Sequence, residues 1–185
     1  MSDLPPDPAA EPPCGLPIGH HPATIAEGRH RYRVRVYFED TDAGGIVYHA
    51  SYLRFAERGR TEALRDLGVP HAELVSAFNL MFVVRRIKVD YLRPARLDDR
   101  LTVTTQPVFV GGASVTLRQS FQRFGEAADL AVAEVKLACV AAGTERPERM
   151  PDRWREALES LHAAGRAGGP AAWPGRAAPA TAFRE

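Results

Sequence analysis

The chain has 185 residues, of which 45% are hydrophobic, and its formal net charge is +1. This length suits one domain with a single core, and the near-neutral charge argues against a nucleic-acid partner, which favours a basic stripe or a pI above about 9. The two cysteines, Cys14 and Cys139, lie far apart, and no Cys and His cluster has zinc spacing. We therefore expect a reduced, cytoplasmic protein without a metal site.

The first part of the chain is rich in proline, with seven prolines in residues 1–28. Large apolar groups are too few there to offset the entropy of ordering, so we expect a disordered arm over residues 1–29. The arm lacks the basic start and apolar run of a secretory signal. No stretch approaches the roughly 18 apolar residues of a membrane-spanning helix, which leaves peripheral membrane contact open.

A folded domain is predicted over residues 30–142. Its first strand is expected at 30–38, where Tyr32, Val34 and Val36 alternate with arginines that form a basic outer face. Residues 50–67 predict the main helix, because apolar and small side chains recur there at helical spacing. Gly59 costs about 1 kcal/mol relative to alanine inside a helix, which predicts a close approach to the sheet at that point.

The second half of the domain predicts four strands after a short helical connection. Pro94, Gly111-Gly112 and Gly125 mark the turns, and the strands are expected at 82–92, 101–110, 114–124 and 130–141. In the first of these, strict alternation would place Val83, Arg85, Ile87, Val89 and Tyr91 on one face. The element order is then β-α-β-β-β-β. A C-terminal extension, 143–164, includes a possible short helix at 152–164 with Trp154, Leu158 and Leu161, and residues 165–185 predict a disordered tail.

The loop between the first strand and the main helix carries the polar groups of a candidate site. Asp42 and His49 flank two glycines and lie just before the helix, whose first N–H groups are unpaired and favour anions. A base, a polar partner and an anion-binding pocket are together sufficient for a hydrolytic site. The alternative is that Asp42 only closes a turn before Gly44 and Gly45.

Two separated motifs resemble a known family. Residues 38–52 have the sequence FEDTDAGGIVYHASY, and residues 82–99 begin FVVRR and end in VDYLRPARLDD. They resemble the hotdog-fold acyl-CoA thioesterases of the 4-hydroxybenzoyl-CoA thioesterase superfamily, most closely the branch associated with the bacterial Tol-Pal system, over roughly residues 31–155. The resemblance implies an α+β hotdog fold, in which a five-stranded antiparallel sheet wraps around one long helix. It also implies hydrolysis of an acyl-CoA to free acid and CoA without a cofactor or metal.

The same resemblance assigns roles to individual residues. Asp42 matches the family's catalytic aspartate, as a nucleophile or as a general base on water, and His49 would position it or the substrate. The backbone N–H of Tyr48, together with that of His49, would bind the oxyanion. The expected substrate-binding residues are Phe38, Gly45 and Val47 near the loop, and Arg85, Arg86 and Lys88 for the phosphates of CoA. A solvated basic strand face is the alternative for these three cations.

Some features depart from the family or leave alternatives open. Relatives often carry tyrosine where this chain has Phe38, so Tyr37 or water would replace that hydroxyl. Glu57 and Glu62 lie on the helix, where other hotdog branches carry a catalytic glutamate, but ion pairs with Arg54, Arg58 or Arg60 are the favoured interpretation. The resemblance implies a homodimer or homotetramer joined edge to edge, with sites at the subunit interface, and leaves acyl carrier protein and the cytoplasmic membrane face open as partners. The rival functions are hydration or dehydration of an acyl thioester, and non-catalytic binding of one as a scaffold.

Overall fold

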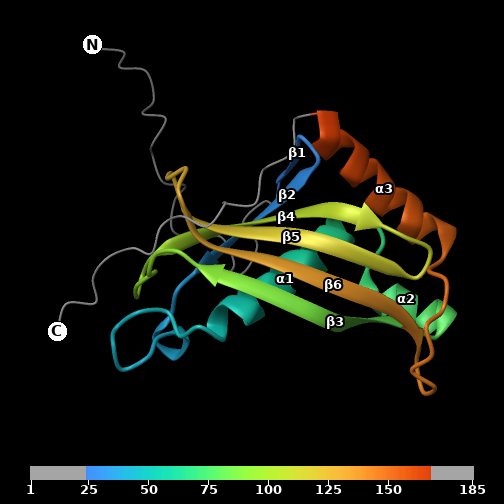
Figure 1. Ribbon diagram of the computed structural model, residues 1–185, viewed down its shortest axis with the longest axis horizontal. Helices are drawn as coiled ribbons and strands as arrows, with labels where there is room; N and C mark the ends of the chain where they lie inside the picture. Colours follow the sequence, from blue (N-terminus) through green and yellow to red (C-terminus); the bar gives the residue numbers. More distant parts are fainter. Residues whose placement is uncertain (1–23, 168–185) are drawn as a thin grey trace, which may run out of the picture.

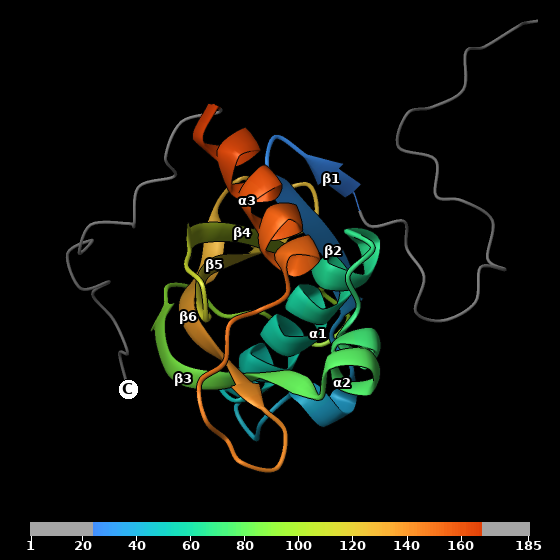
Figure 2. The ribbon, with the colours of Figure 1, turned by 90° about the vertical axis from the view of Figure 1, so that its right-hand side faces the viewer.

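The computed structural model describes residues 24–167, and the predicted arm and tail lie largely outside them. A six-stranded antiparallel sheet curls around α1 (Ser51–Asp66), and Figure 1 and Figure 2 show the helix inside the curve. The strand order is β1-β2-β4-β5-β6-β3. The strands are β1 (Thr24–Ala26), β2 (Arg29–Arg35), β3 (Leu80–Tyr91), β4 (Arg100–Val110), β5 (Ser114–Arg123) and β6 (Asp129–Ala141). The α+β class and the helix within a sheet were both predicted.

The sixth strand corrects the boundary of the predicted arm. Thr24–Ala26 pairs with the start of β2 through a tight turn at Glu27 and Gly28, both with positive φ. Two such residues in succession are typical of a hairpin turn whose twist matches its strands. The folded domain therefore begins before residue 30.

The opposite terminus also extends further than predicted. The helix α3 (Asp152–Ala167) continues past residue 164 into the predicted tail. Its last turn lies against the β1–β2 turn, where a Cβ on Gly28 would lie 1.9 Å from the backbone nitrogen of Gly165. The two chain extensions therefore contact each other, and the predicted anchors Trp154, Leu158 and Leu161 are all buried.

The first predicted strand, 30–38, ends early. β2 stops at Arg35, and Phe38–Asp40 forms a single 3-10 turn. The reason is local, because the buried Asp40 carboxylate accepts a hydrogen bond from the N–H of Tyr37 at 2.9 Å. This bond closes the turn and directs the chain towards α1.

The main helix agrees with its prediction to within about one residue at each end. Its buried side is Ser51, Tyr52, Phe55, Ala56, Gly59, Ala63 and Leu64. The expected close approach at Gly59 is confirmed, since a Cβ there would lie 2.9 Å from Cγ1 of Val103 on β4. Next to it, Nε2 of Gln119 donates to the Ala56 carbonyl at 2.8 Å and to Oγ1 of Thr105 at 2.9 Å.

We expect Gly59→Ala to destabilise the protein although alanine is the better helix former. The contact with Val103 forces a shift of closely packed groups, which costs about 1–3 kcal/mol and exceeds the gain of about 1 kcal/mol in helix propensity. Urea denaturation should show a lower free energy of unfolding. The control is Arg58→Ala on the exposed side of α1, and a Gly59→Ala protein as stable as that control would contradict the packing argument.

Strand β3 forms one edge of the sheet and contains a bulge. Its register with β6 shifts between Val84 and Arg86. The predicted assignment of alternate residues to the two faces of the sheet is therefore wrong for the residues before the bulge. Val83 pairs with Ala138 on the outer face, whereas Ile87, Val89 and Tyr91 face the helix side, because directly paired residues share a face. Among the described residues β3 pairs only with β6, which leaves its other edge unpaired.

Candidate active site at the entrance of α1

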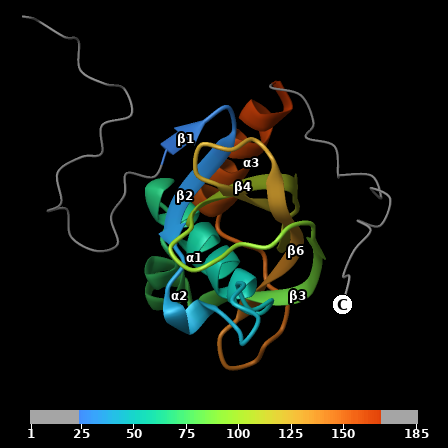
Figure 3. The same cartoon turned by 90° about the vertical axis from the view of Figure 1, so that its left-hand side faces the viewer.

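The loop before α1 is a tight hairpin that ends beside β3 (Figure 3). The N–H of Asp42 donates to the Ile46 carbonyl at 2.9 Å, and the N–H of Gly45 donates to the Asp42 carbonyl at 3.0 Å. Gly45 has φ +70°, which glycine adopts without strain. The N–H of Val47 then binds the Ala95 carbonyl at 2.8 Å, which fixes the loop to the segment before β4.

Two neighbouring aspartates have different roles in this loop. Asp40 is 2% exposed and holds the 3-10 turn through Tyr37. Asp42 is exposed, and its Oδ1 accepts the Gly44 N–H at 2.8 Å. The turn-closing role considered for Asp42 is therefore real, but it occupies one oxygen. No hydrogen bond to Oδ2 comes from any residue of 24–167, so this oxygen is available to a substrate or water.

The backbone amides at the start of α1 divide into used and unused donors. The N–H of Tyr48 donates to the Asp40 carbonyl at 2.8 Å, and the N–H of Ser51 donates to the Tyr48 carbonyl at 2.8 Å. Because a trans peptide is planar, the second bond directs the N–H of His49 away from the helix. That N–H has no acceptor within the described part of the chain. A free donor is therefore at His49, while the Tyr48 donor is already engaged.

His49 is held by a residue that the sequence did not single out. The Tyr91 hydroxyl donates to the His49 carbonyl at 2.9 Å, and the two rings meet edge to face with centroids 6.4 Å apart. Burial raises the pKa of the Tyr91 phenol, which keeps it protonated as a donor. Within residues 24–167 no hydrogen bond joins the His49 ring to Asp42. The only sequence signal for Tyr91 was its place in the second motif.

The other expected substrate contacts lie at different depths. Phe38 is 81% exposed and Gly45 is exposed, so both are accessible at the loop surface. Val47 is buried, and its side chain belongs to the core rather than to a binding surface. Tyr37, considered as a substitute for the missing family hydroxyl, is half exposed beside Phe38.

The three cations of β3 lie along the strand, away from the loop. Arg85 and Arg86 are five or six residues from Tyr91, roughly 17–20 Å at the rise of a strand. Arg86 lies 3.7 Å from Glu134, and Lys88 lies 3.8 Å from Asp90. With Lys136 and Ser114, the two arginines line a hollow of about 470 Å³ on the outer face of the sheet. They are therefore not gathered around Asp42 of the same subunit.

The helical glutamates have local partners, and the predicted partner Arg60 interacts electrostatically with Glu57, which opposes the lowering of the Arg60 pKa by burial. Glu62 pairs with Arg65 instead of Arg58, and Glu57 accepts a hydrogen bond from Oγ1 of Thr61 at 2.8 Å. Both lie on α1 beyond its first turn. Neither glutamate is therefore at the helix entrance, where Asp42 and the unpaired His49 N–H lie.

No three His, Cys, Asp or Glu side chains within residues 24–167 are arranged to hold a metal ion. None of the described helices is long and apolar enough to cross a membrane.

Comparison with known proteins adds evidence from relatives. Residues 36–158 match the model of the family described as the thioesterase-like superfamily. The acyl-CoA thioesterase YbgC of Haemophilus influenzae is 44% identical over 130 residues, which cover 70% of this chain and 94% of that protein. The 1,4-dihydroxy-2-naphthoyl-CoA hydrolase of Thermosynechococcus vestitus is 30% identical over 122 residues, covering 65% and 82%.

A solved structure supports the same grouping. The crystal structure of a probable thioesterase from Bartonella henselae has a TM-score of 0.63 and 38% sequence identity. The match covers 66% of this chain and 99% of that one. The family match leaves out β1, β2 and the end of α3.

Proposed function

Because this chain belongs to the thioesterase-like superfamily, we propose that it hydrolyses acyl-CoA thioesters to the free carboxylic acid and CoA. Membership confirms the predicted hotdog fold, with a short sixth strand added to the five expected. One of the relatives named above is called an acyl-CoA thioesterase without a stated acyl group, and the other is a 1,4-dihydroxy-2-naphthoyl-CoA hydrolase, so the family alone does not select the acyl group.

One observation carries the proposal. An exposed carboxylate oxygen of Asp42 lies in the same loop as the unpaired His49 N–H at the entrance of α1. Hydrolysis of a thioester needs a base or nucleophile and a donor aimed at the developing oxyanion. The positive end of the helix dipole strengthens such a donor.

Two routes use these groups. In the first, the Asp42 carboxylate attacks the thioester carbonyl, the C–S bond breaks with release of the CoA thiolate, and water cleaves the resulting anhydride. In the second, Asp42 takes a proton from water as the water attacks the thioester carbonyl, and the C–S bond then breaks with release of the CoA thiolate. In both routes the His49 N–H stabilises the oxyanion, and the Tyr48 N–H contributes only if it leaves the Asp40 carbonyl.

The two rival functions lead to different products. A hydratase would convert an enoyl thioester without releasing thiol, and a scaffold protein would bind acyl-CoA without turnover. The exposed, unpaired oxygen of Asp42 is accessible to a substrate or to water, which a catalytic carboxylate requires and a scaffold role does not.

A homodimer joined through β3 is part of the proposal. The helix-facing side chains of Val84, Ile87 and Tyr91 on this unpaired edge are 48%, 36% and 48% exposed. Long exposed edges with apolar side chains favour pairing with a second strand. A homotetramer built from two such dimers, the Tol-Pal association, acyl carrier protein, and a cytoplasmic site with peripheral membrane contact stay predictions.

The outer hollow beside Arg85 and Arg86 is our proposed site for the phosphates of CoA. Pairing of two β3 strands about their midpoint would place these arginines near the dimer axis, similarly distant from both Asp42 loops. Guanidinium groups bind phosphate through several parallel hydrogen bonds. Lys136 and Ser114 add donors to the same hollow, whereas Lys88 lies nearer to the loop and pairs with Asp90.

A thiol-release assay across short, long and aromatic acyl-CoAs tests the proposed function. We expect time-dependent release of CoA with at least one series. Burial raises the pKa of the Cys139 thiol to about 11, so this residue should react slowly with the thiol reagent and give little background. Turnover of enoyl-CoA without thiol release would favour the hydratase, and saturable binding without any turnover would favour the scaffold.

We expect Tyr91→Phe to lower kcat roughly fivefold. Losing one hydrogen bond of about 1 kcal/mol loosens the His49 carbonyl and so the orientation of the helix entrance. The matched control is Tyr32→Phe, which removes a hydroxyl from a tyrosine packed against the core from β2. Equal kcat values for the two variants would remove Tyr91 from the site.

A further inference from the structure

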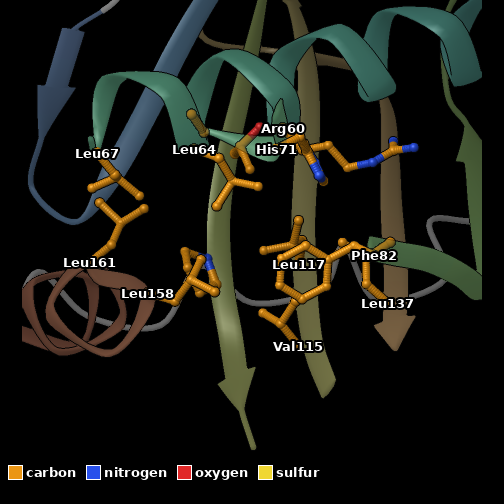
Figure 4. A pocket seen from close by; sticks show the side chains of 13 residues that line it. Arg60, Leu64, Leu67, His71, Phe82, Val115, Leu117, Leu137, Leu158 and Leu161 are labelled. Carbon is orange, nitrogen blue, oxygen red and sulfur yellow. The ribbon is translucent and has the colours of Figure 1, made fainter. Parts of the chain in front are cut away.

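A narrow apolar cavity lies at the end of α1 opposite to the Asp42 loop. It is enclosed by α1, by α2 (His71–Phe78), by α3 and by the inner face of the sheet (Figure 4). Its volume is about 20 Å³, which is room for about one or two small groups. Leu64 of α1, Leu117 of β5 and Leu158 and Leu161 of α3 point into it (Figure 4). We call it the α3 cavity.

The α3 cavity is open on the side towards β3. Arg60, His71 and Phe82 are only partly buried, whereas Leu64 and Leu117 are buried. The His71 and Phe82 rings meet edge to face with centroids 5.7 Å apart. Burial lowers the pKa of His71, which keeps the imidazole neutral near pH 7 and the opening suitable for an apolar group.

The cavity lies too far from Asp42 of its own subunit to serve it. Thirteen residues of helix separate Ser51 from Leu64, roughly 20 Å. Phe55 and Ala56 fill the space between α1 and the sheet and are fully buried. A chain bound at the loop therefore has no path through its own core to this cavity.

An edge-to-edge dimer brings the cavity to the other subunit's site. When two β3 strands pair antiparallel over their full length, the partner's Tyr91 lies opposite Leu80, at a strand spacing of about 4.8 Å. Tyr91 binds the carbonyl of His49 at the helix entrance. The partner's helix entrance would therefore lie beside Phe82 and the open side of the α3 cavity.

We propose that the α3 cavity takes the terminal methylenes of a straight aliphatic acyl chain whose thioester is bound at the partner subunit's Asp42. This inference rests on the proposed function and names its substrate class. The lining offers carbon atoms almost throughout, so the hydroxyl of a hydroxylated aromatic acyl group would be left unpaired there. Leu158 and Leu161 close the far end and set the longest chain accepted, and Leu161 lies beyond the residues that match the family.

The test is the dependence of kcat/KM on chain length in a series of saturated acyl-CoAs. Leu161→Ala removes three carbons from the closed end. For a chain about two carbons above the wild-type limit, we expect kcat/KM to rise about tenfold relative to that for a short chain. Leu161→Phe fills the cavity and should lower the same ratio for chains at the wild-type limit. The control is Leu74→Ala, a fully buried leucine of α2 outside the lining, which should leave the ratio unchanged.

Failure of the proposal and failure of the proposed function have different signatures. If wild-type protein hydrolyses saturated acyl-CoAs but neither Leu161 variant shifts the ratio, the α3 cavity is not the acyl site. If only hydroxylated aromatic acyl-CoAs are hydrolysed, the substrate class is wrong. If no acyl-CoA is hydrolysed at all, the proposed function fails first.

A mixed dimer separates the two subunits' roles. One subunit carries Asp42→Asn together with Leu161→Ala, and the other is wild type, so only the wild-type Asp42 can act. Differently tagged subunits allow purification of this pair. A longer chain-length limit, as in the Leu161→Ala homodimer, supports a cavity that serves the partner's site. A wild-type limit would show that each subunit uses its own cavity and overturn the assignment.

Discussion

Asp42→Asn should lower kcat for thiol release by at least about 10³-fold while leaving the melting temperature almost unchanged. The substitution keeps the side chain's shape and an oxygen that can accept the Gly44 N–H, so the turn can persist. It removes the negative charge needed by a nucleophile or a general base. Because Asp42 is exposed, little folding energy depends on its charge.

The control for this prediction is Glu39, three positions before Asp42. Glu39→Gln is the same isosteric loss of charge at an exposed residue of the 3-10 turn, and we expect its kcat to stay near the wild-type value. Both variants are compared by thiol release and by thermal unfolding. Wild-type turnover in Asp42→Asn would remove this residue from the mechanism, whereas equal losses in both variants would indicate a general effect of loop charge.

Short-range patterns were sufficient to predict most of the fold. The apolar stripe on α1 and the paired glycines after β4 act within one element or one turn, so the sequence predicts them directly. The Asp42 loop was also predictable, because its turn is closed by short-range hydrogen bonds among residues 42–46.

Features that depend on distant segments could not be predicted in the same way. The three-residue β1 is stabilised by pairing with β2 and by the close approach of Gly28 to Gly165 near the other end of the chain. The bulge in β3 reverses the facing of Val83, and single-strand alternation carries no signal for it.

Some features of the candidate site also depend on contacts with other segments, so the sequence alone did not predict them. The sequence indicated the helix entrance as the source of oxyanion donors, but not which amide is free. That depends on the Asp40 carbonyl, which accepts the Tyr48 N–H, whereas the His49 N–H stays unpaired within the described residues. The contact between Tyr91 and His49 joins residues 42 positions apart, beyond the reach of a local motif.

Ile87→Lys should convert the dimer to a monomer and lower thiol release by roughly 10²-fold. Ile87 lies on the unpaired edge of β3, on the side that faces the helix, and is 36% exposed. In a β3-to-β3 dimer this side chain would be buried near the axis, where an unpaired ammonium is costly. In a monomer the lysine can reach water, so the fold should persist.

The matched control is Ile25→Lys, because Ile25 is 42% exposed on β1 at the other edge of the same sheet. Light scattering gives the mass of each variant, and the thiol-release assay gives its activity. A dimeric Ile87→Lys protein would place the interface elsewhere. A monomeric but fully active one would mean that Asp42 and the His49 amide are sufficient within one subunit. If Ile87→Lys has the mass of a monomer and loses activity, and Ile25→Lys does neither, the acyl group needs the second subunit in order to reach the geometry for attack.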